Sequence, residues 1–150
     1  MYDGVVANRD ILENARCFPA AQPLAPAVPM KPRSVLVIED DAFISLLIDE
    51  LLVEMGHVVC ASVGTEVEAI SAARRYKPDL MIADVRLRAG DGISAVTEIL
   101  RGGAVPHIFL SGDAEGVLAR RPDAIVVRKP FRQSSFASAV ETALKAAAVC

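Results

Sequence analysis

The sequence is poor in the residues that mark several large classes of protein. It has no tryptophan and only three cysteines, and aromatic residues make up 5% of its 150 residues. The cysteines (Cys17, Cys60 and Cys150) are odd in number, far apart and without metal-ligand spacing, which predicts a reducing, cytoplasmic compartment. No apolar run approaches the length of a membrane span, and the first residues lack the apolar segment of a signal peptide.

Clusters of basic residues are also absent from the sequence. The chain carries 16 Lys and Arg against 19 Asp and Glu, a net charge of −3, so the sequence does not indicate a nucleic-acid partner. Hydrophobic residues make up 53% of the chain and charged residues 23%, a balance typical of a globular protein. A chain of this length suits one domain with a sizeable core.

Residues 1–32 differ in composition from the rest of the chain. The segment from Asn8 to Cys17 is compatible with a short helix, and prolines then recur among alanines at positions 19, 23, 26, 29 and 32. This pattern predicts an extended or disordered arm or linker, with docking on the folded domain or on a dimer partner left open as the alternative. The folded domain is therefore expected over residues 33–149.

From Ser34 onward, short apolar runs alternate with helical patterns. Strands are expected over residues 35–38, 58–61, 80–83, 107–110 and 125–127. Each helix between the strands is expected to bury a stripe of apolar side chains. In the first helix this stripe includes Ile44, Leu47, Ile48, Leu51, Leu52 and Met55. In the second it includes Val67, Ile70 and Ala73. A third helix spans Ile93 to Leu100, a short one lies between residues 114 and 121, and the last covers residues 134–148. This alternation predicts a doubly wound α/β fold with a five-stranded parallel sheet.

Polar side chains stand where four of these strands end. Glu39 and Asp40 follow the first strand, Asp84 ends the third, Ser111 follows the fourth and Lys129 the fifth. The carboxyl ends of parallel strands share one edge of a sheet, so these groups are expected to converge. Three carboxylates in one pocket would repel each other, which favours the ammonium of Lys129 and a divalent cation, best Mg²⁺, as partners.

Four motifs in this order make the chain resemble the receiver domain of two-component response regulators, over roughly residues 33–149. The motifs are Val35 to Asp41, Asp79 to Asp84 with Asp91-Gly92, Phe109 to Gly112, and Lys129-Pro130-Phe131. The resemblance implies a flavodoxin-like (βα)5 sheet with strand order 2-1-3-4-5. It also implies that Asp84 is the phosphoacceptor, that Ser111 is the switch hydroxyl and that Lys129 pairs with the phosphate.

The same resemblance implies a metal site and a set of partners. Mg²⁺ would be bound by Glu39, Asp40, Asp84 and the backbone carbonyl of Arg86. The Lys129–Pro130 bond would be cis. Asp41 is interpreted instead as a residue that starts a helix. The phosphoryl donor would be the phosphohistidine of a sensor histidine kinase or a histidine phosphotransfer protein. Slow self-dephosphorylation, and no turnover of an external substrate, is expected, so the chain is not predicted to be an enzyme.

The output of such a receiver is less clearly indicated by the sequence. The chain ends just after the final helix, so a stand-alone receiver is expected. Such a receiver would signal by contact with an unknown protein or act as a phosphate sink. A homodimer is left open. Val126 occupies the position of the aromatic switch residue of typical receivers, and Arg88 stands where many have proline. The switch is therefore expected to run through the loop and short helix from Gly112 to Leu118.

Three other functions fit the residues less well. A phosphatase of the haloacid dehalogenase type needs a second Asp two residues after its nucleophile, where this chain has Arg86. A nucleotide-binding Rossmann domain would carry Gly-x-Gly-x-x-Gly after the first strand. A receiver-like adaptor that acts without phosphorylation remains the alternative, although Glu39, Asp40, Asp84, Ser111 and Lys129 are all present.

Overall fold

The structure, a computed structural model, describes residues 31–149. Nearly all of the predicted arm of residues 1–32, including the expected helix from Asn8 to Cys17, lies outside the described residues. The predicted domain of residues 33–149 lies within them. None of the helices in this range is both long and apolar enough to cross a bilayer.

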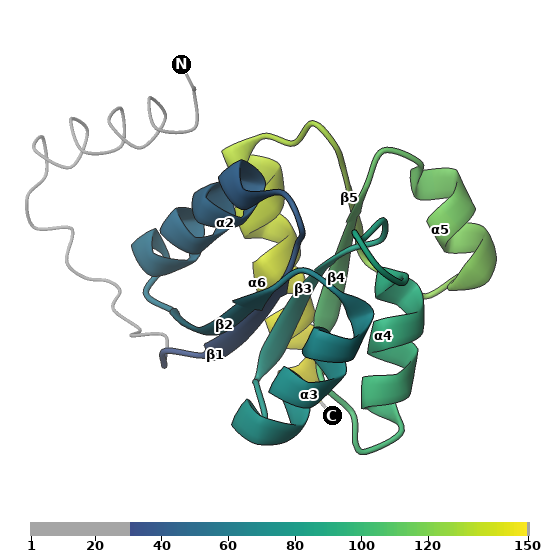
Figure 1. The fold of residues 1–150 in the computed structure, drawn as a ribbon. Coiled ribbons are helices and arrows are strands. Elements are labelled where there is room, and N and C mark those ends of the chain that lie inside the picture. Colours follow the sequence, from purple (N-terminus) through teal and green to yellow (C-terminus); the bar gives the residue numbers. More distant parts are fainter. Residues whose placement is uncertain (1–30, 150) are drawn as a thin grey trace, which may run out of the picture.

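The described chain alternates five strands and five helices around one parallel sheet (Figure 1). The strands are β1 (Ser34–Ile38), β2 (Val58–Val63), β3 (Leu80–Asp84), β4 (His107–Ser111) and β5 (Val126–Arg128). The helices are α2 (Ala42–Glu54), α3 (Glu66–Tyr76), α4 (Gly92–Leu100), α5 (Ala114–Arg120) and α6 (Gln133–Val149). The strand order is β2-β1-β3-β4-β5, which confirms the predicted fold class and strand order.

Helices cover both faces of the sheet, as Figure 1 shows. Successive side chains of a strand point to opposite faces, so Val35 and Val37 of β1 pack with α2 and α6, whereas Leu36 and Ile38 pack with α3, α4 and α5. The central strand β3 is buried along its whole length. This burial explains why its sequence is an unbroken apolar run that ends in a carboxylate.

Short polar side chains fix the starts of the helices. The carboxylate of Asp41 accepts hydrogen bonds from the main-chain nitrogens of Phe43 and Ile44, which confirms Asp41 as a helix-start residue. The hydroxyl of Thr65 accepts one from Glu68 N, which forms one half of a capping box. The carboxylate of Glu68 accepts a hydrogen bond from the N–H of Gly64, the residue before Thr65, at 3.2 Å.

Two expected core residues are exposed instead. Leu47 is 42% exposed and Val67 is 76% exposed. The buried face of α3 consists of Ala69, Ala72 and Ala73, whose small side chains let the helix pack closely on the sheet. Because alanines give a weak apolar signal, the prediction wrongly placed the larger Val67 in the core. The predicted apolar stripe of α2 was also too wide, since it included Leu47, which lies on the outer side of that helix.

Burial of His57 makes the stability of the domain sensitive to acid. Its Nδ1 atom accepts a hydrogen bond from Arg33 N at 3.1 Å, and burial, followed by the charge of Arg33, lowers its pKa below 6.5. The folded state therefore prefers the neutral ring, and the unfolded state takes up a proton first as the pH falls. This contribution to stability is present above pH 6.5 and is lost as the pH falls through the folded-state pKa.

We expect the free energy of unfolding to decline below pH 6.5 by up to about 1.4 kcal/mol per pH unit for this histidine. Urea unfolding of the wild type and of His57→Asn, whose amide oxygen replaces the Nδ1 acceptor, would measure the difference between pH 7.5 and pH 5. The variant should show the shallower decline, and His107, whose pKa is also lowered by burial, accounts for part of the decline that remains. Equal declines in the two proteins would contradict the assignment to His57.

Candidate functional site

An open pocket of about 820 Å³ lies at the carboxyl edge of the sheet. Each polar residue predicted at a strand end lines it: Glu39, Asp40, Asp84, Ser111 and Lys129. The parallel strands carry these residues to one edge, as expected from their positions in the sequence. Arg86, whose carbonyl was predicted as a metal ligand, lines the same pocket.

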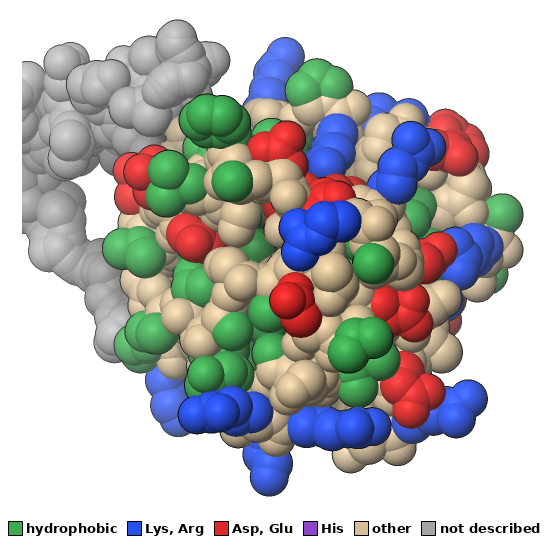
Figure 2. All heavy atoms as spheres, in the orientation of Figure 1, with side chains coloured by type: hydrophobic (Ala, Val, Ile, Leu, Met, Phe, Trp, Pro, Cys, Tyr) green, Lys and Arg blue, Asp and Glu red, His purple; other side chains and the backbone are tan. Residues whose placement is uncertain are grey.

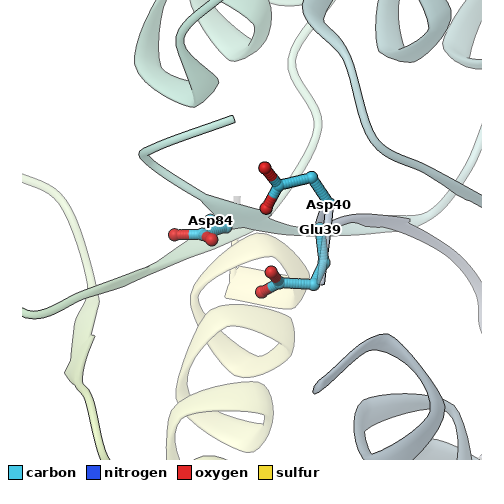
Figure 3. Close-up of side chains that lie close together, drawn as sticks. All are labelled: Glu39, Asp40 and Asp84. Atoms are coloured by element: carbon cyan, nitrogen blue, oxygen red, sulfur yellow. The ribbon is translucent and has the colours of Figure 1, made fainter. Parts of the chain in front are cut away.

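Three carboxylates form the floor of the site (Figure 3). Glu39 and Asp40 follow β1 and Asp84 ends β3; because β1 and β3 are neighbours in register (Ile38 pairs with Ala83), their ends coincide. One carboxylate oxygen from each acid lies within 4.8 Å of the others. Glu39 is 4% exposed and Asp84 is 6% exposed, so two of the three charges are nearly removed from water.

Lys129 supplies the positive charge beside these acids. Its Nζ atom lies 3.1 Å from Asp84 Oδ2 and 3.5 Å from Glu39 Oε1. The main chain holds it there, since Lys129 N donates to the carbonyl of Ser111 at 2.8 Å and the following bond to Pro130 is cis, as the resemblance implied. Burial favours the neutral amine, but the hydrogen bond and charge of Asp84 and the charge of Glu39 outweigh it and raise the pKa of Lys129.

Glu39 is poorly satisfied by the protein alone. Its Oε2 accepts a hydrogen bond from Asp41 N at 3.0 Å, whereas the buried Oε1 has Lys129 Nζ 3.5 Å away but accepts no hydrogen bond from the residues described. Burial, together with the charge of Asp84, raises the pKa of Glu39 to about 7, although the hydrogen bond from Asp41 N and the charge of Lys129 lower it. A divalent cation would offset both the missing hydrogen bond to Oε1 and the repulsion between the carboxylates. Three carboxylates beside an open pocket are a donor set that fits Mg²⁺.

Ser111 connects the pocket to helix α5. Its Oγ atom accepts a hydrogen bond from Asp113 N at 2.9 Å, which leaves the hydroxyl proton available for donation into the pocket. Asp113 in turn caps α5 by accepting from Gly116 N at 3.0 Å. A group that bonds to Ser111 therefore acts on the residue that starts α5.

The loop after β3 contains contacts that the sequence reasoning missed. Arg120 Nη1, from α5, lies 2.9 Å from Oδ2 of Asp91, the residue that caps α4. These residues are 29 positions apart, so no local pattern indicates the pair. The lack of a side chain at Gly92 is also required, because a Cβ atom there would clash with the carbonyl oxygen of Asp84. In the sequence, Gly92 stood out only as part of the motif that ends in Asp91-Gly92.

Val126 lies where typical receivers were expected to carry an aromatic switch residue. It pairs with Phe109 of β4 and is half-buried in the core on the side of α3, α4 and α5. Its aliphatic side chain cannot turn between inward and outward ring positions.

Comparison with known proteins shows the family to which this fold belongs. Residues 35–141 match the response regulator receiver domain, so the chain belongs to the response regulator receiver family. It is 36% identical over 117 residues to the transcriptional regulatory protein PdtaR of Mycobacterium tuberculosis, an alignment that covers 75% of this chain and 57% of PdtaR. It is 33% identical to the phyllosphere-induced regulator PhyR of Methylorubrum extorquens, over 73% of this chain and 43% of PhyR.

Solved structures of PhyR proteins show the same fold. The solution structure of the Erythrobacter litoralis PhyR receiver domain has a TM-score of 0.72 and 35% identity, covering 77% of this chain and 92% of that domain. The crystal structure of Brucella abortus PhyR has a TM-score of 0.75 and 30% identity, covering 79% of this chain and 50% of that protein. The chain thus spans about half the length of the full-length regulators that it matches.

Proposed function

We propose that the chain receives a phosphoryl group on Asp84 in a two-component phosphorelay, from the phosphohistidine of a sensor histidine kinase or a histidine phosphotransfer protein. The observation that supports this most directly is the meeting of Glu39, Asp40 and Asp84 with Lys129 at one open pocket. Reactions of phosphoryl groups depend mainly on positioning and on electrostatic stabilisation, and this arrangement supplies both.

In the proposed step, a carboxylate oxygen of Asp84 attacks phosphorus. An oxygen–phosphorus bond forms as the phosphorus–nitrogen bond breaks, and the bonding electron pair returns to the imidazole of the donor histidine. The Lys129 ammonium already contacts Asp84 at 3.1 Å, so it lies close enough to neutralise charge on the phosphoryl oxygens. The product is a mixed anhydride that water can hydrolyse, which agrees with slow self-dephosphorylation and not with turnover of an external substrate.

The acids of the pocket would also hold a metal ion. Glu39, Asp40 and Asp84, with the main-chain carbonyl of Arg86, would bind Mg²⁺. Bound there, Mg²⁺ would supply positive charge to the phosphoryl oxygens. The raised pKa of Glu39, and its buried oxygen that faces Lys129 at 3.5 Å but accepts no hydrogen bond, support this role, because a second cation would stabilise the ionised carboxylate.

The signal would leave the site through Ser111. Donation from its hydroxyl to a phosphoryl oxygen would draw Ser111 Oγ inward, carry with it the residue whose N–H it accepts from, Asp113, and so shift the loop and short helix from Gly112 to Leu118. We propose a cytoplasmic protein whose output is contact with a downstream protein or competition for phosphoryl groups. A homodimer is compatible with this output.

Uptake of phosphate from acetyl phosphate tests the proposal. With Mg²⁺ present, we expect a phosphate-sized gain in intact mass that maps to the peptide containing Asp84. Asp40→Asn should bind Mg²⁺ at least about tenfold more weakly in calorimetry and should take up phosphate correspondingly slowly. Asp41→Asn is the matched control, since the same charge is removed one residue along, at a residue that caps α2.

Failure to gain mass in the presence of Mg²⁺, or a gain on a residue other than Asp84, would overturn the proposal. The first outcome would favour a receiver-like adaptor that acts without phosphorylation. Equal weakening of Mg²⁺ binding in Asp40→Asn and Asp41→Asn would show that the general negative charge, and not the three-carboxylate site, attracts the ion.

A further inference from the structure

A groove of about 690 Å³ lies between the C-terminal ends of α3 and α4, which pack side by side on one face of the sheet (Figure 1). Pro78 and Val105 line it and come just before β3 and β4, so the groove lies at the amino edge of the sheet, opposite the pocket of Asp84. We call it the α3–α4 groove and define it by six of its lining residues: Ile70, Ile99, Val105, Arg74, Lys77 and Arg101.

Three of these residues give the groove an apolar lining that is only partly covered. Ile70, Ile99 and Val105 are each half-buried. Ile99 and Val105 also pack against the core on this side of the sheet, so the protein holds them in place. Large apolar side chains that line a hollow and keep part of their surface in water favour a ligand that brings an apolar side chain of its own.

The other three residues carry positive charge that the protein does not fully balance. Within residues 31–149, Arg74 and Lys77 form no ion pair, and Arg101 pairs with Glu98 at 3.5 Å, where both side chains are exposed. Figure 2 shows Lys and Arg side chains along the lower edge of the molecule, where the C-terminal ends of α3 and α4 lie in Figure 1. The α3–α4 groove is thus positive in a chain whose net charge is −3.

The backbone of Lys77 indicates that its charge serves more than the end of a helix. Lys77 has the left-handed conformation, with φ 47° and ψ 63°, and no other non-glycine residue among residues 31–149 has a positive φ. Its N–H donates to Ala73 O at 2.9 Å and so ends α3, a role that glycine or asparagine fills with less strain. The dipole of α3 favours cations in its last turn, such as Arg74, but it does not require a lysine at the strained position that follows. Residues held in such conformations cluster at binding sites.

The lining of the groove favours a protein segment over a nucleic acid. A nucleic acid brings a long and dense row of phosphates, which a chain of net charge −3 repels as a whole. An acidic peptide brings separate carboxylates and can place an apolar side chain between Ile70, Ile99 and Val105. The acids of the Asp84 pocket, at the opposite edge of the sheet, would steer its carboxylates toward the amino edge.

We propose that the α3–α4 groove binds an acidic segment of a partner protein. Carboxylates of the segment pair with Arg74, Lys77 and Arg101, and one of its large apolar side chains packs against the apolar lining. Because the pocket of Asp84 lies at the opposite edge of the sheet, the partner and a phosphoryl donor can be bound together. That consequence rests on the proposed function, but binding at the groove does not.

Titration of the ¹⁵N-labelled full chain with a synthetic peptide tests this binding by NMR, without any phosphoryl transfer. The probe is Glu-Asp-Leu repeated four times, with both ends blocked. We expect changes in the amide signals of residues 70–77 and 98–105, none at Asp84, and weaker binding when the salt concentration rises from about 0.05 M to about 0.5 M. A second probe with serine in place of leucine should bind at least about tenfold more weakly, because it has no large apolar side chain to bury.

Arg74→Gln combined with Lys77→Gln should raise the dissociation constant of the leucine probe about tenfold, or about threefold for each exposed ion pair that is lost. Arg132→Gln combined with Lys145→Gln is the matched control, because both residues are exposed cations outside the groove and the change in net charge is the same. The control variant should bind the probe as the wild type does.

Four outcomes would overturn the proposal. Unchanged signals at residues 70–77 and 98–105 would show that the groove takes no acidic segment. Equal weakening in the two double variants would show that binding depends on net charge alone, and equal affinity for the two probes would show that the apolar lining is not used. A thymidine oligonucleotide of about twelve residues that shifts the same signals at lower concentration than the peptide would assign the groove to a nucleic acid. None of these measurements involves phosphoryl transfer, so each outcome leaves the proposed function as it stands.

Discussion

Asp84→Asn is expected to take up no phosphate from acetyl phosphate, so its intact mass should stay unchanged under conditions that modify the wild type. An amide is a far weaker nucleophile than a carboxylate, and its oxygen carries no charge to attract a cation. The change also removes the partner of Lys129 Nζ, now 3.1 Å from Asp84 Oδ2. Loss of the acceptor atom and of one metal ligand together should reduce the reaction below detection.

Asp113→Asn is the matched control for this experiment. Asp113 lines the same pocket and carries the same charge, but its carboxylate caps α5 through Gly116 N, a role that the Asn oxygen can also fill. We expect phosphate uptake close to that of the wild type. Phosphate uptake by Asp84→Asn would move the acceptor to another residue, and peptide mapping would identify it.

Lys129→Met should slow phosphate uptake by about 100-fold, the effect typical of removing one preorganised group that stabilises transition-state charge. Met keeps most of the apolar length of the side chain and removes the ammonium. Glu39 and Asp84 would then face each other without the cation that lies 3.5 Å and 3.1 Å from them. Rates of mass gain under single-turnover conditions would measure the effect.

Lys145→Met serves as the control, because Lys145 is an exposed lysine of α6. Its rate should equal that of the wild type. In the absence of metal, Lys129→Met should also unfold at a lower temperature, and Mg²⁺ should restore part of the difference because it replaces the missing positive charge. A wild-type rate in Lys129→Met would show that the contact between Lys129 and Asp84 is structural only.

The elements of this protein were predictable because their signals are local. The run of Leu80 to Ala83 ends in Asp84, and the structure makes it the central buried strand of the sheet. Asp41 and Thr65 cap helices through main-chain nitrogens only two or three residues away. Parallel pairing also follows from the alternation of strands and helices, and it brings the strand-end residues to one edge of the sheet.

By itself, the sequence determined the order of the strands and helices, the placement of Glu39, Asp40, Asp84, Ser111 and Lys129 at strand ends, and the absence of an aromatic at position 126. Only the tertiary structure decided that Arg120 pairs with Asp91, that Gly92 must lack a side chain, and that α2 keeps a second apolar side. These features depend on atoms that meet after the sheet and its helices have packed. Arg120 and Asp91 lie 29 positions apart, so no periodicity, cap or turn signal along the chain encodes their contact. The space at Gly92 and the exposure of the outer residues of α2 are likewise set by packing.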